Sequence, residues 1–404
     1  MRNNIFELTT DELKKIADAL QKKIEEGLEK DGMEISCIPT HIIPKKSIGE
    51  GKVLVLDWGG TNFRAAIVEF KNGKTTVIET LSKEKKYTLS AKETVGFTQN
   101  KLNEKMASWI CELKHLDKDV TKIGYCFSYP AASRLNGDAV LLRWTKGLNI
   151  PDMIGKNVGE PLMTCLNNYK GIKTKFTDVK VLNDTVACLF AGLSESGYDS
   201  YLGLIVGTGT NMASLMRLDK IEKLNNKGES SIPVNLESGN FYPPYLTVVD
   251  GLVDAMSNNK GHQRFEKAIS GGYVGELFKT VFMHEKIDYG CDGGTLAKMI
   301  RNPEANNADH VAVARWIYER SAKLVAASLA GLVQALVAQD PSLKNLCLAA
   351  DGTVFWDTDK DNNLYYKELV SKELQLLLPK GVNITIINKM ADPNLVGSAI
   401  AALS

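Results

Sequence analysis

The sequence predicts an α/β protein built from two lobes with a cleft between them. Runs rich in Val, Ile and Leu alternate with helical patterns along the chain, which is typical of the α/β class. Two similar strand–turn–strand segments occur, one in each half. The chain has 404 residues, 44% of them hydrophobic, so it can bury two proper cores. No low-complexity linker separates the halves.

The first half begins with an amphipathic helix and then alternates strands with helices. Thr10 is the expected N-cap of the first helix, whose apolar residues recur at helical spacing. A proline-marked extended link follows this helix. The expected elements are a helix at 9–28, strands at 53–56 and 63–70, a helix at 94–113, strands at 123–127 and 179–182, and a helix at 185–192.

The second half repeats the strand hairpin from about residue 201 and is mainly helical over 252–338. Its longest apolar stretch, 324–338, is interrupted by two polar residues and is shorter than the ~20 residues that span a bilayer. It is therefore expected to be a buried helix. A strand at 346–350 and an Ala-rich helix at 393–403 complete the chain.

The most informative segment is 53–70, VLVLDWGGTNFRAAIVEF. A buried strand ends at Asp57, and a glycine turn leads directly into another strand, whereas a Walker loop would lead into a helix. Successive N–H groups in such a turn can form a nest for phosphate. Asp57 beside a phosphate predicts a magnesium ion between them. The alternative is an ordinary hairpin, but the added Thr61, Asn62 and Arg64 favour the phosphate site.

A second hairpin of the same kind spans 204–214, LIVGTGTNMAS. Its Gly209-Thr210-Asn211 aligns with Gly60-Thr61-Asn62, and apolar strands precede both turns. A single repeat is weak evidence on its own. Two phosphate-type hairpins nevertheless predict a nucleotide in the cleft between two lobes.

The composition excludes several classes of partner and compartment. A formal net charge of +1 gives no support for binding nucleic acid or an anionic membrane. The N-terminus lacks the apolar core of a signal peptide. Seven cysteines without a Cys-x-x-Cys pair indicate reduced thiols in a cytosol, and five histidines form no metal-binding pattern.

Three further polar patches follow predicted strands: 127–130 (FSYP), 145–147 (TKG) and Asn183-Asp184. Asp184 at the start of a helix is held ionised by the helix dipole, and an ionised carboxylate in a cleft can accept a hydroxyl proton. The alternative for Asn183-Asp184 is a plain N-cap, and on spacing alone that is the better explanation. Lys146 alone would be a surface lysine.

Taken together and in order, these motifs resemble the hexokinase family within the actin-like, ribonuclease H-like superfold. The resemblance rests on the phosphate hairpin, FSYP, WTKG, NDTV, GTGTN and ADGT, and it extends from about Ile38 to the C-terminal helix. Bacterial glucokinases of the repressor-related type share the first hairpin. They usually carry Cys/His zinc ligands, which this sequence lacks.

The resemblance implies two actin-like lobes and ATP-dependent phosphorylation of a hexose, with glucose favoured, at its 6-hydroxyl, as the first step of glycolysis. ATP and Mg²⁺ are the expected cofactors, the expected location is the cytoplasm, and the chain is expected as a monomer or homodimer with no nucleic-acid or membrane partner. The implied domains are an N-terminal helical segment at 1–46 packing on the larger lobe, a smaller lobe at 47–185 and a larger lobe at 186–404. In an alternative, helix 393–404 returns to the smaller lobe.

The resemblance also assigns roles. Asp184 matches the general base, with Lys146 and Arg64 as further catalytic residues. The implied hexose ligands are Ser128, Thr145, Lys146, Asn183, Asp184, Asn211, Glu237 and Glu266. The implied nucleotide site comprises Asp57, Gly59, Gly60, Thr61, Asn62, Arg64, Gly207, Thr208, Gly209, Gly352, Thr353, Gly397 and Ser398. Asp57 is the implied magnesium ligand, through water.

The sequence departs from the family at Trp58, at 212–214 and at Ser238, where the family usually has Leu, Ala-Cys-Tyr and Trp. These changes are expected to alter the pocket walls, which leaves open the choice among glucose, mannose, fructose and glucosamine. Two other functions remain: an actin- or chaperone-like ATPase that switches a binding surface, and a catalytically inactive sugar sensor. Intact Asp57, Arg64, Lys146 and Asp184 argue against the sensor.

Overall fold

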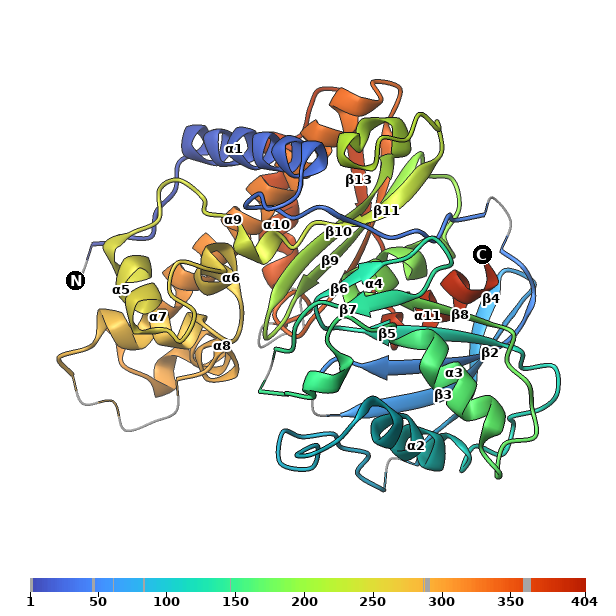
Figure 1. Cartoon of the computed structure of the whole chain (residues 1–404). Helices are drawn as coiled ribbons and strands as arrows, with labels where there is room; N and C mark the ends of the chain where they lie inside the picture. The colour runs from blue at the N-terminus through green and yellow to red at the C-terminus, as the bar shows by residue number, and fades with distance from the viewer. Residues whose placement is uncertain are drawn as a thin grey trace.

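The chain forms two lobes, each built on its own sheet, in a computed structural model that describes residues 3–45, 48–60, 62–82, 84–145, 147–285, 287, 291–358 and 365–404 (Figure 1). The expected α/β class and the two-lobed architecture are confirmed. Thr61 and Lys146 lie outside the described residues.

The smaller lobe contains a five-stranded sheet in the order β4-β3-β2-β5-β8. The β2–β3 and β3–β4 pairs are antiparallel, whereas β5 pairs parallel with both β2 and β8. Its strands are β2 (Gly51–Trp58), β3 (Phe63–Lys71), β4 (Lys74–Thr80), β5 (Lys122–Phe127) and β8 (Asp178–Leu182). A short hairpin, β6 (Ala131–Ser133) and β7 (Ala139–Leu141), follows β5.

Alternate side chains of β2 enter different cores, because successive residues of a strand point to opposite faces. Leu54 and Leu56 join the core that includes residues of α2 (Gln99–Ile110) and α3 (Gly159–Asn168). Val53 and Val55 join the core formed with α4 (Asp184–Gly192) and α11 (Pro393–Leu403). The C-terminal helix therefore packs on the sheet of the smaller lobe, and Figure 1 shows α4 and α11 between the two sheets.

The larger lobe contains a six-stranded sheet in the order β1-β11-β10-β9-β12-β13. The strands are β1 (Ile38–Pro39), β9 (Ser200–Val206), β10 (Thr210–Arg217), β11 (Ser231–Asn235), β12 (Asn345–Asp351) and β13 (Asn383–Ile386). Helices α1 (Thr10–Glu29), α9 (Ala308–Gln339) and α10 (Tyr365–Leu377) pack together, and the largest core joins α1 and α9 to β9. The N-terminal helix thus packs on the larger lobe.

A helical region projects from the larger lobe on the left of Figure 1. It comprises α5 (Val248–Met256), α6 (Arg264–Ile269), α7 (Val274–Val281) and α8 (Gly293–Arg301). Short 3₁₀ turns occur at Pro151–Met153, Leu218–Lys220, Glu222–Leu224, Ser238–Asn240 and Pro303–Ala305.

Helix α9 contains the long apolar stretch of the sequence. By length and composition it could span a membrane, but 78% of its most apolar window is buried inside the molecule. The expectation of a buried core helix is therefore confirmed.

Two predicted helix starts were wrong. Thr9, not Thr10, caps α1, because its hydroxyl accepts the N–H of Glu12 while the Glu12 carboxylate accepts the N–H of Thr9. Helix α2 begins at Gln99 rather than near residue 94, because Thr98 is its N-cap and turns occupy residues 91–96.

Candidate active site

A cavity of about 1270 Å³ lies between the lobes and is lined by residues of both. It brings together most of the predicted site. The predicted residues that line it are Gly59, Ser128, Thr145, Asn183, Asp184, Gly207, Thr208, Gly209, Asn211, Glu237, Glu266, Gly352 and Thr353.

Asp184 lies at the N-terminus of α4, directly after β8 ends. Its Oδ1 accepts the N–H of Thr185 at 2.8 Å, which fixes the carboxylate at the helix end. Asn183 caps the same helix by accepting that N–H at 2.9 Å. The capping explanation is therefore correct for Asn183, and it is compatible with a cavity-facing Asp184.

Glu237 is positioned by an amide network that the sequence did not indicate. The Asn211 side chain donates to Asn235 Oδ1 at 2.7 Å, and the Asn235 side chain donates to Glu237 Oε1 at 2.8 Å. Asn235 is buried at the end of β11 and so orients two predicted hexose ligands. Glu237 itself has a left-handed backbone, with φ of 58°.

Glu266, a predicted hexose ligand, contacts the second predicted phosphate turn. Its Oε2 accepts the N–H of Thr210 at 3.0 Å. A Cβ on Gly209 would lie 2.7 Å from the same oxygen, so only glycine fits there without displacing the carboxylate. The turn and the carboxylate are thus packed as one unit.

Three glycine-containing loops meet around this second turn. Gly207 accepts the N–H of Gly271 at 2.8 Å, and Thr208 accepts that of Gly272 at 3.1 Å. Gly352 has a φ of 111°, which side-chain-bearing residues rarely adopt, and a Cβ there would lie 2.2 Å from the carbonyl oxygen of Val206. This arrangement presents backbone groups closely to the cavity, as a phosphate or adenosine site requires.

The first phosphate turn is only partly at the cavity. Gly59 lines it, whereas Asp57, Gly60, Asn62 and Arg64 do not. Asp57 is buried and paired with Arg64 through two bonds to Oδ2, of which that from Nε is 3.0 Å. Arg64 also donates to Asp392 Oδ1 at 2.7 Å. Burial opposes the charge of Arg64, but Asp57 and Asp392 raise its pKa overall.

An aromatic cluster joins this turn to the segments 127–130 and 141–148, which the resemblance assigns to sugar binding. Tyr129, a cavity residue within the predicted 127–130 patch that was given no role of its own, donates its hydroxyl to the carbonyl oxygen of Gly60 at 3.0 Å. Its ring lies 5.2 Å from that of Trp58 and 5.0 Å from that of Trp144. Trp58 is fully buried and does not itself line the cavity, so it can alter the pocket wall only through Tyr129, on which its ring packs. Ser238, another substituted wall position, donates its backbone N–H to Asn211 Oδ1.

Gly397 and Ser398 do not belong to a nucleotide site. Both are buried in α11. A Cβ on Gly397 would lie 1.7 Å from the carbonyl oxygen of Ala187, so the glycine is required for close packing of α11 on α4. The backbone of Ser398 packs equally closely against Gly124. Their assignment to the adenosine end is therefore corrected.

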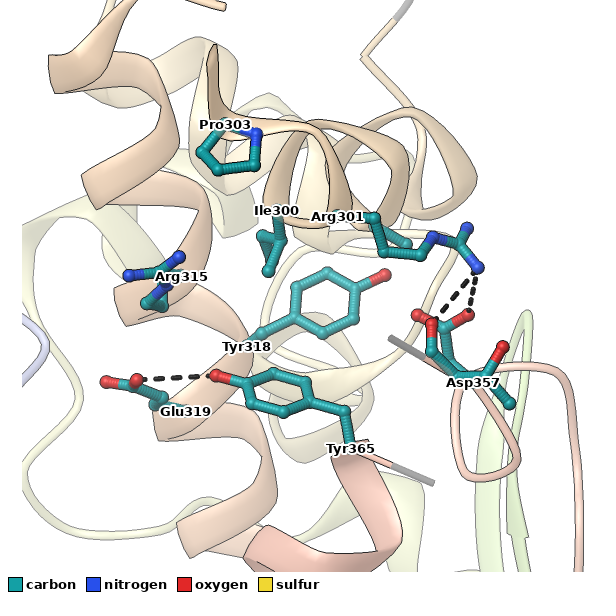
Figure 2. Close-up of a pocket in the computed structure, with 10 residues that line it drawn as sticks. Ile300, Arg301, Pro303, Arg315, Tyr318, Glu319, Asp357 and Tyr365 are labelled. Atoms are coloured by element: carbon teal, nitrogen blue, oxygen red, sulfur yellow. Dashed lines mark hydrogen bonds and ion pairs between the residues drawn. The ribbon is translucent and has the colours of Figure 1, made fainter. Parts of the chain in front are cut away.

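A second cavity, of about 440 Å³, lies in the larger lobe and contains none of the predicted site residues (Figure 2). Arg301 pairs with Asp357 at 3.3 Å and donates to Thr358 at 3.1 Å. Tyr365 donates to Glu319 at 3.4 Å. Burial raises the pKa of Asp357, although Arg301 opposes this. These polar groups satisfy one another and do not form an acid–base site.

Comparison with known proteins gives matches along nearly the whole chain. Residues 3–193 match one family model described as hexokinase, and residues 201–299 and 294–404 match a second with the same description. Hexokinase-2 of Schizosaccharomyces pombe is 30% identical over 80% of this chain and 72% of its own length. Hexokinase-1 of Saccharomyces cerevisiae is 33% identical over 69% of this chain and 59% of its own length.

The matched segments do not always span the relatives. The match to a glucokinase of Aspergillus niger, 31% identical, covers 65% of this chain and 58% of that protein. Among solved structures, a Schistosoma mansoni hexokinase complexed with glucose superposes with a TM-score of 0.79 at 23% identity, covering 99% of this chain and 96% of that one. A Streptomyces griseus glucokinase in complex with glucose and AMPPNP gives 0.54 at 17% identity, covering 87% and 98%. These similarities support the fold.

Proposed function

The chain belongs to the hexokinase family, and from this premise we propose that it transfers the terminal phosphoryl group of ATP to the 6-hydroxyl of a hexose, with glucose favoured. One observation carries the proposal. The carboxylate-bearing residue at the start of α4, Asp184, shares a cavity with Glu237, Glu266 and two glycine turns suited to phosphate. This reaction would be the first step of glycolysis.

The proposed mechanism assigns the sugar to carboxylate and amide groups. Glu237, Glu266 and Asn211 would bind hexose hydroxyls from the larger lobe, since ionised acceptors make the stronger hydrogen bonds. Ser128 and Thr145 would bind them from the smaller lobe. Asp184 would orient the 6-hydroxyl and accept its proton, while alignment and charge neutralisation supply most of the rate.

We further propose that magnesium accompanies the nucleotide. Among the described residues, no group of three or more His, Cys, Asp or Glu side chains could hold a metal. The Asp57 carboxylate is a single protein ligand, and its Oδ2 is already bonded to Arg64. Asp57 therefore fits Mg²⁺ only if phosphate oxygens supply most of the ion's ligands and Asp57 contacts the ion through water. When bound, the ion would neutralise phosphate charge.

A coupled assay of ADP release with glucose, mannose, fructose and glucosamine tests the proposal. We expect turnover only when a sugar is present. Equal ATP turnover without sugar would instead support the switching ATPase, and sugar binding without turnover would support the sensor. The sequence pattern of the cysteines, with no Cys-x-x-Cys pair, favours a reducing, cytoplasmic location.

Replacing Glu237 or Glu266 by Gln should weaken glucose binding about tenfold or more, because a charge-assisted bond becomes a neutral one. Nucleotide affinity should change less. Isothermal titration with each ligand measures both effects. Glu276→Gln is the control, because Glu276 is an exposed carboxylate on α7 that lies outside the cavity. Loss of nucleotide affinity alone would remove both residues from the sugar site.

Glucose alone should draw the lobes, proposed at 47–185 with the C-terminal helix α11 and at 186–392, closer together. Its ligands lie on both lobes, so all its hydroxyls can be satisfied only when the lobes meet. Trp144 packs on Tyr129 in the sugar loop and should report closure by fluorescence, and small-angle scattering should give a smaller radius of gyration. ATP alone should produce much less closure. Tight glucose binding with an unchanged scattering profile would disprove the two-lobe clamp.

A further inference from the structure

The loop between α5 and α6, residues 257–263, forms part of the cavity wall on the larger lobe, in the helical region on the left of Figure 1. Three of its side chains line the cavity: Asn259, His262 and Gln263. In this part of the chain the family resemblance gave a role only to Glu266, which follows on α6. His262 is exposed, and among the described residues its ring has no hydrogen-bond partner. The loop therefore offers the cavity polar groups that the proposed mechanism does not use.

One buried carboxylate holds this loop. Asp254 lies on α5, is 5% exposed and does not itself line the cavity. Its two oxygens accept the same N–H, that of Gly261, at 3.0 and 3.1 Å. Lys267 donates to Asp254 at 2.7 Å and to the carbonyl oxygen of Asn259 at 2.9 Å. The loop is thus attached at two points to one buried ion pair, by charge-assisted bonds that are stronger than neutral ones.

The backbone of the loop needs these attachments. Gly261 has a φ of 81°, and Gln263, which carries a side chain, has a φ of 51°. A left-handed backbone is unfavourable for a residue with a side chain, and it persists only where the surrounding structure imposes it. The Gln263 side chain also accepts a bond from the Asn259 amide, so the shape of the loop decides where both side chains point.

The same ion pair sets the direction of Glu266. Lys267 follows Glu266 directly on α6 and is 2% exposed. Successive residues of a helix point about 100° apart, so the bond from Lys267 to Asp254 fixes which way Glu266 faces. Glu266 is thereby held at the cavity, where its Oε2 accepts the N–H of Thr210 at 3.0 Å. One buried pair therefore positions both the loop and a predicted hexose ligand.

We propose that Asp254 is a positioning residue for the hexose, and that the loop it holds forms a wall of the sugar site on which Asn259 and His262 contact sugar hydroxyls. The proposal rests on the proposed function, because it takes a hexose as the ligand of the cleft. Amide and imidazole groups can both donate and accept hydrogen bonds, as sugar hydroxyls do. Because Asp254 does not line the cavity, it acts on the sugar only through Gly261 and Lys267.

Asp254→Asn tests the proposal, because Asn keeps the shape of the side chain but loses its charge and one of its two acceptor oxygens. The variant should raise the dissociation constant and the KM for glucose at least about tenfold. Its kcat and its KM for ATP should stay within about threefold of wild type, since a lost binding contact raises KM without lowering kcat. Isothermal titration and the coupled assay measure these values.

Asp250→Asn is the matched control. Asp250 is the same residue type on the same helix and is also 5% exposed, but it bonds to Thr247 and Arg320, which lie outside the loop. The control should be destabilised in urea unfolding, as expected for a broken buried pair, yet keep the KM for glucose within about twofold of wild type.

Gly261→Ala alters the loop without touching the buried pair, so it tests the proposal even if Asp254→Asn does not fold. A Cβ at this position would meet no atom, but the φ of 81° disfavours any side chain. The fold should survive, and the KM for glucose should rise about threefold or more as the loop shifts.

Hydrogen exchange of a peptide spanning 257–263 measures the loop directly. Glucose should slow this exchange in wild type, and without sugar Asp254→Asn should speed it whereas Asp250→Asn should not. Equal glucose KM values in the two aspartate variants would overturn the proposal, as would exchange that glucose leaves unchanged. A wild-type chain that neither binds nor phosphorylates glucose, mannose, fructose or glucosamine would overturn the proposed function, and this proposal with it.

Discussion

Asp184→Ala is expected to lower kcat by at least ~10²-fold, because the variant loses both the acceptor of the hydroxyl proton and the group that orients that hydroxyl. The fold should survive. Asn183 alone still caps α4, since its side chain accepts the N–H of Thr185 at 2.9 Å. Glucose should still bind measurably, because Glu237 and Glu266 remain.

The coupled assay measures kcat, and isothermal titration measures glucose binding in the same preparation. Asp178→Ala provides a matched control, since Asp178 is a carboxylate at the other end of β8, pairs with Lys180 at 3.1 Å and does not line the cavity. That control should keep activity. Turnover of Asp184→Ala within a few-fold of wild type would mean that another group acts as the base.

The parts of the site that lie within one short segment could be predicted from the sequence. A glycine turn between two buried strands is a local feature, and the structure places Gly59 and the 207–209 turn at the cavity. Asn183-Asp184 was ambiguous by spacing, and only the family resemblance favoured a role beyond capping. The structure shows that capping and cavity exposure coexist.

Contacts between segments distant in sequence could not be predicted in this way. Asp392 joins Arg64 across most of the chain, and no local pattern indicated this pair. Gly397 was assigned to the adenosine end by the family resemblance, but here it serves the close approach of α11 and α4. Asn235 acts through a side-chain network, which spacing does not reveal.

The sequence predicted only that 252–338 is mainly helical, and it did not predict which side of α5 (Val248–Met256) faces the core. Asp250 and Asp254 in an otherwise apolar segment would ordinarily mark the solvent side of a helix. Their cationic partners, of which Lys267 and Arg320 are buried, come from α6 and α9. The tertiary ion pairs therefore hold both carboxylates on the buried face of α5, beside Val249 and Val253.

Arg320→Met should destabilise the larger lobe by about 3–5 kcal/mol, the range for removing one partner of a buried pair. The Arg320 side chain is 1% exposed, donates twice to Asp250 and lies 4.6 Å from the centroid of the Phe6 ring. Met retains much of its volume but leaves the Asp250 carboxylate buried without its cation. Urea unfolding followed by circular dichroism measures the loss. Arg217→Met, which breaks a partly exposed pair with Asp219, should cost far less.

The pH dependence of this loss separates lost charge pairing from lost packing. Burial alone would raise the pKa of Asp250, but Arg320 and Thr247 hold it below its ordinary value. In the wild-type chain the contribution of Asp250 is therefore present above the unfolded-state pKa of ~4 and disappears as the pH falls. Without Arg320, burial should dominate and raise that pKa, so protonation should stabilise the variant. The difference in unfolding free energy between wild type and Arg320→Met should therefore begin to narrow above about pH 4, as the buried carboxylate of the variant is protonated, and should narrow further below about pH 4, as wild type loses its own contribution. A difference that stays constant with pH would instead assign the loss to packing against Phe6.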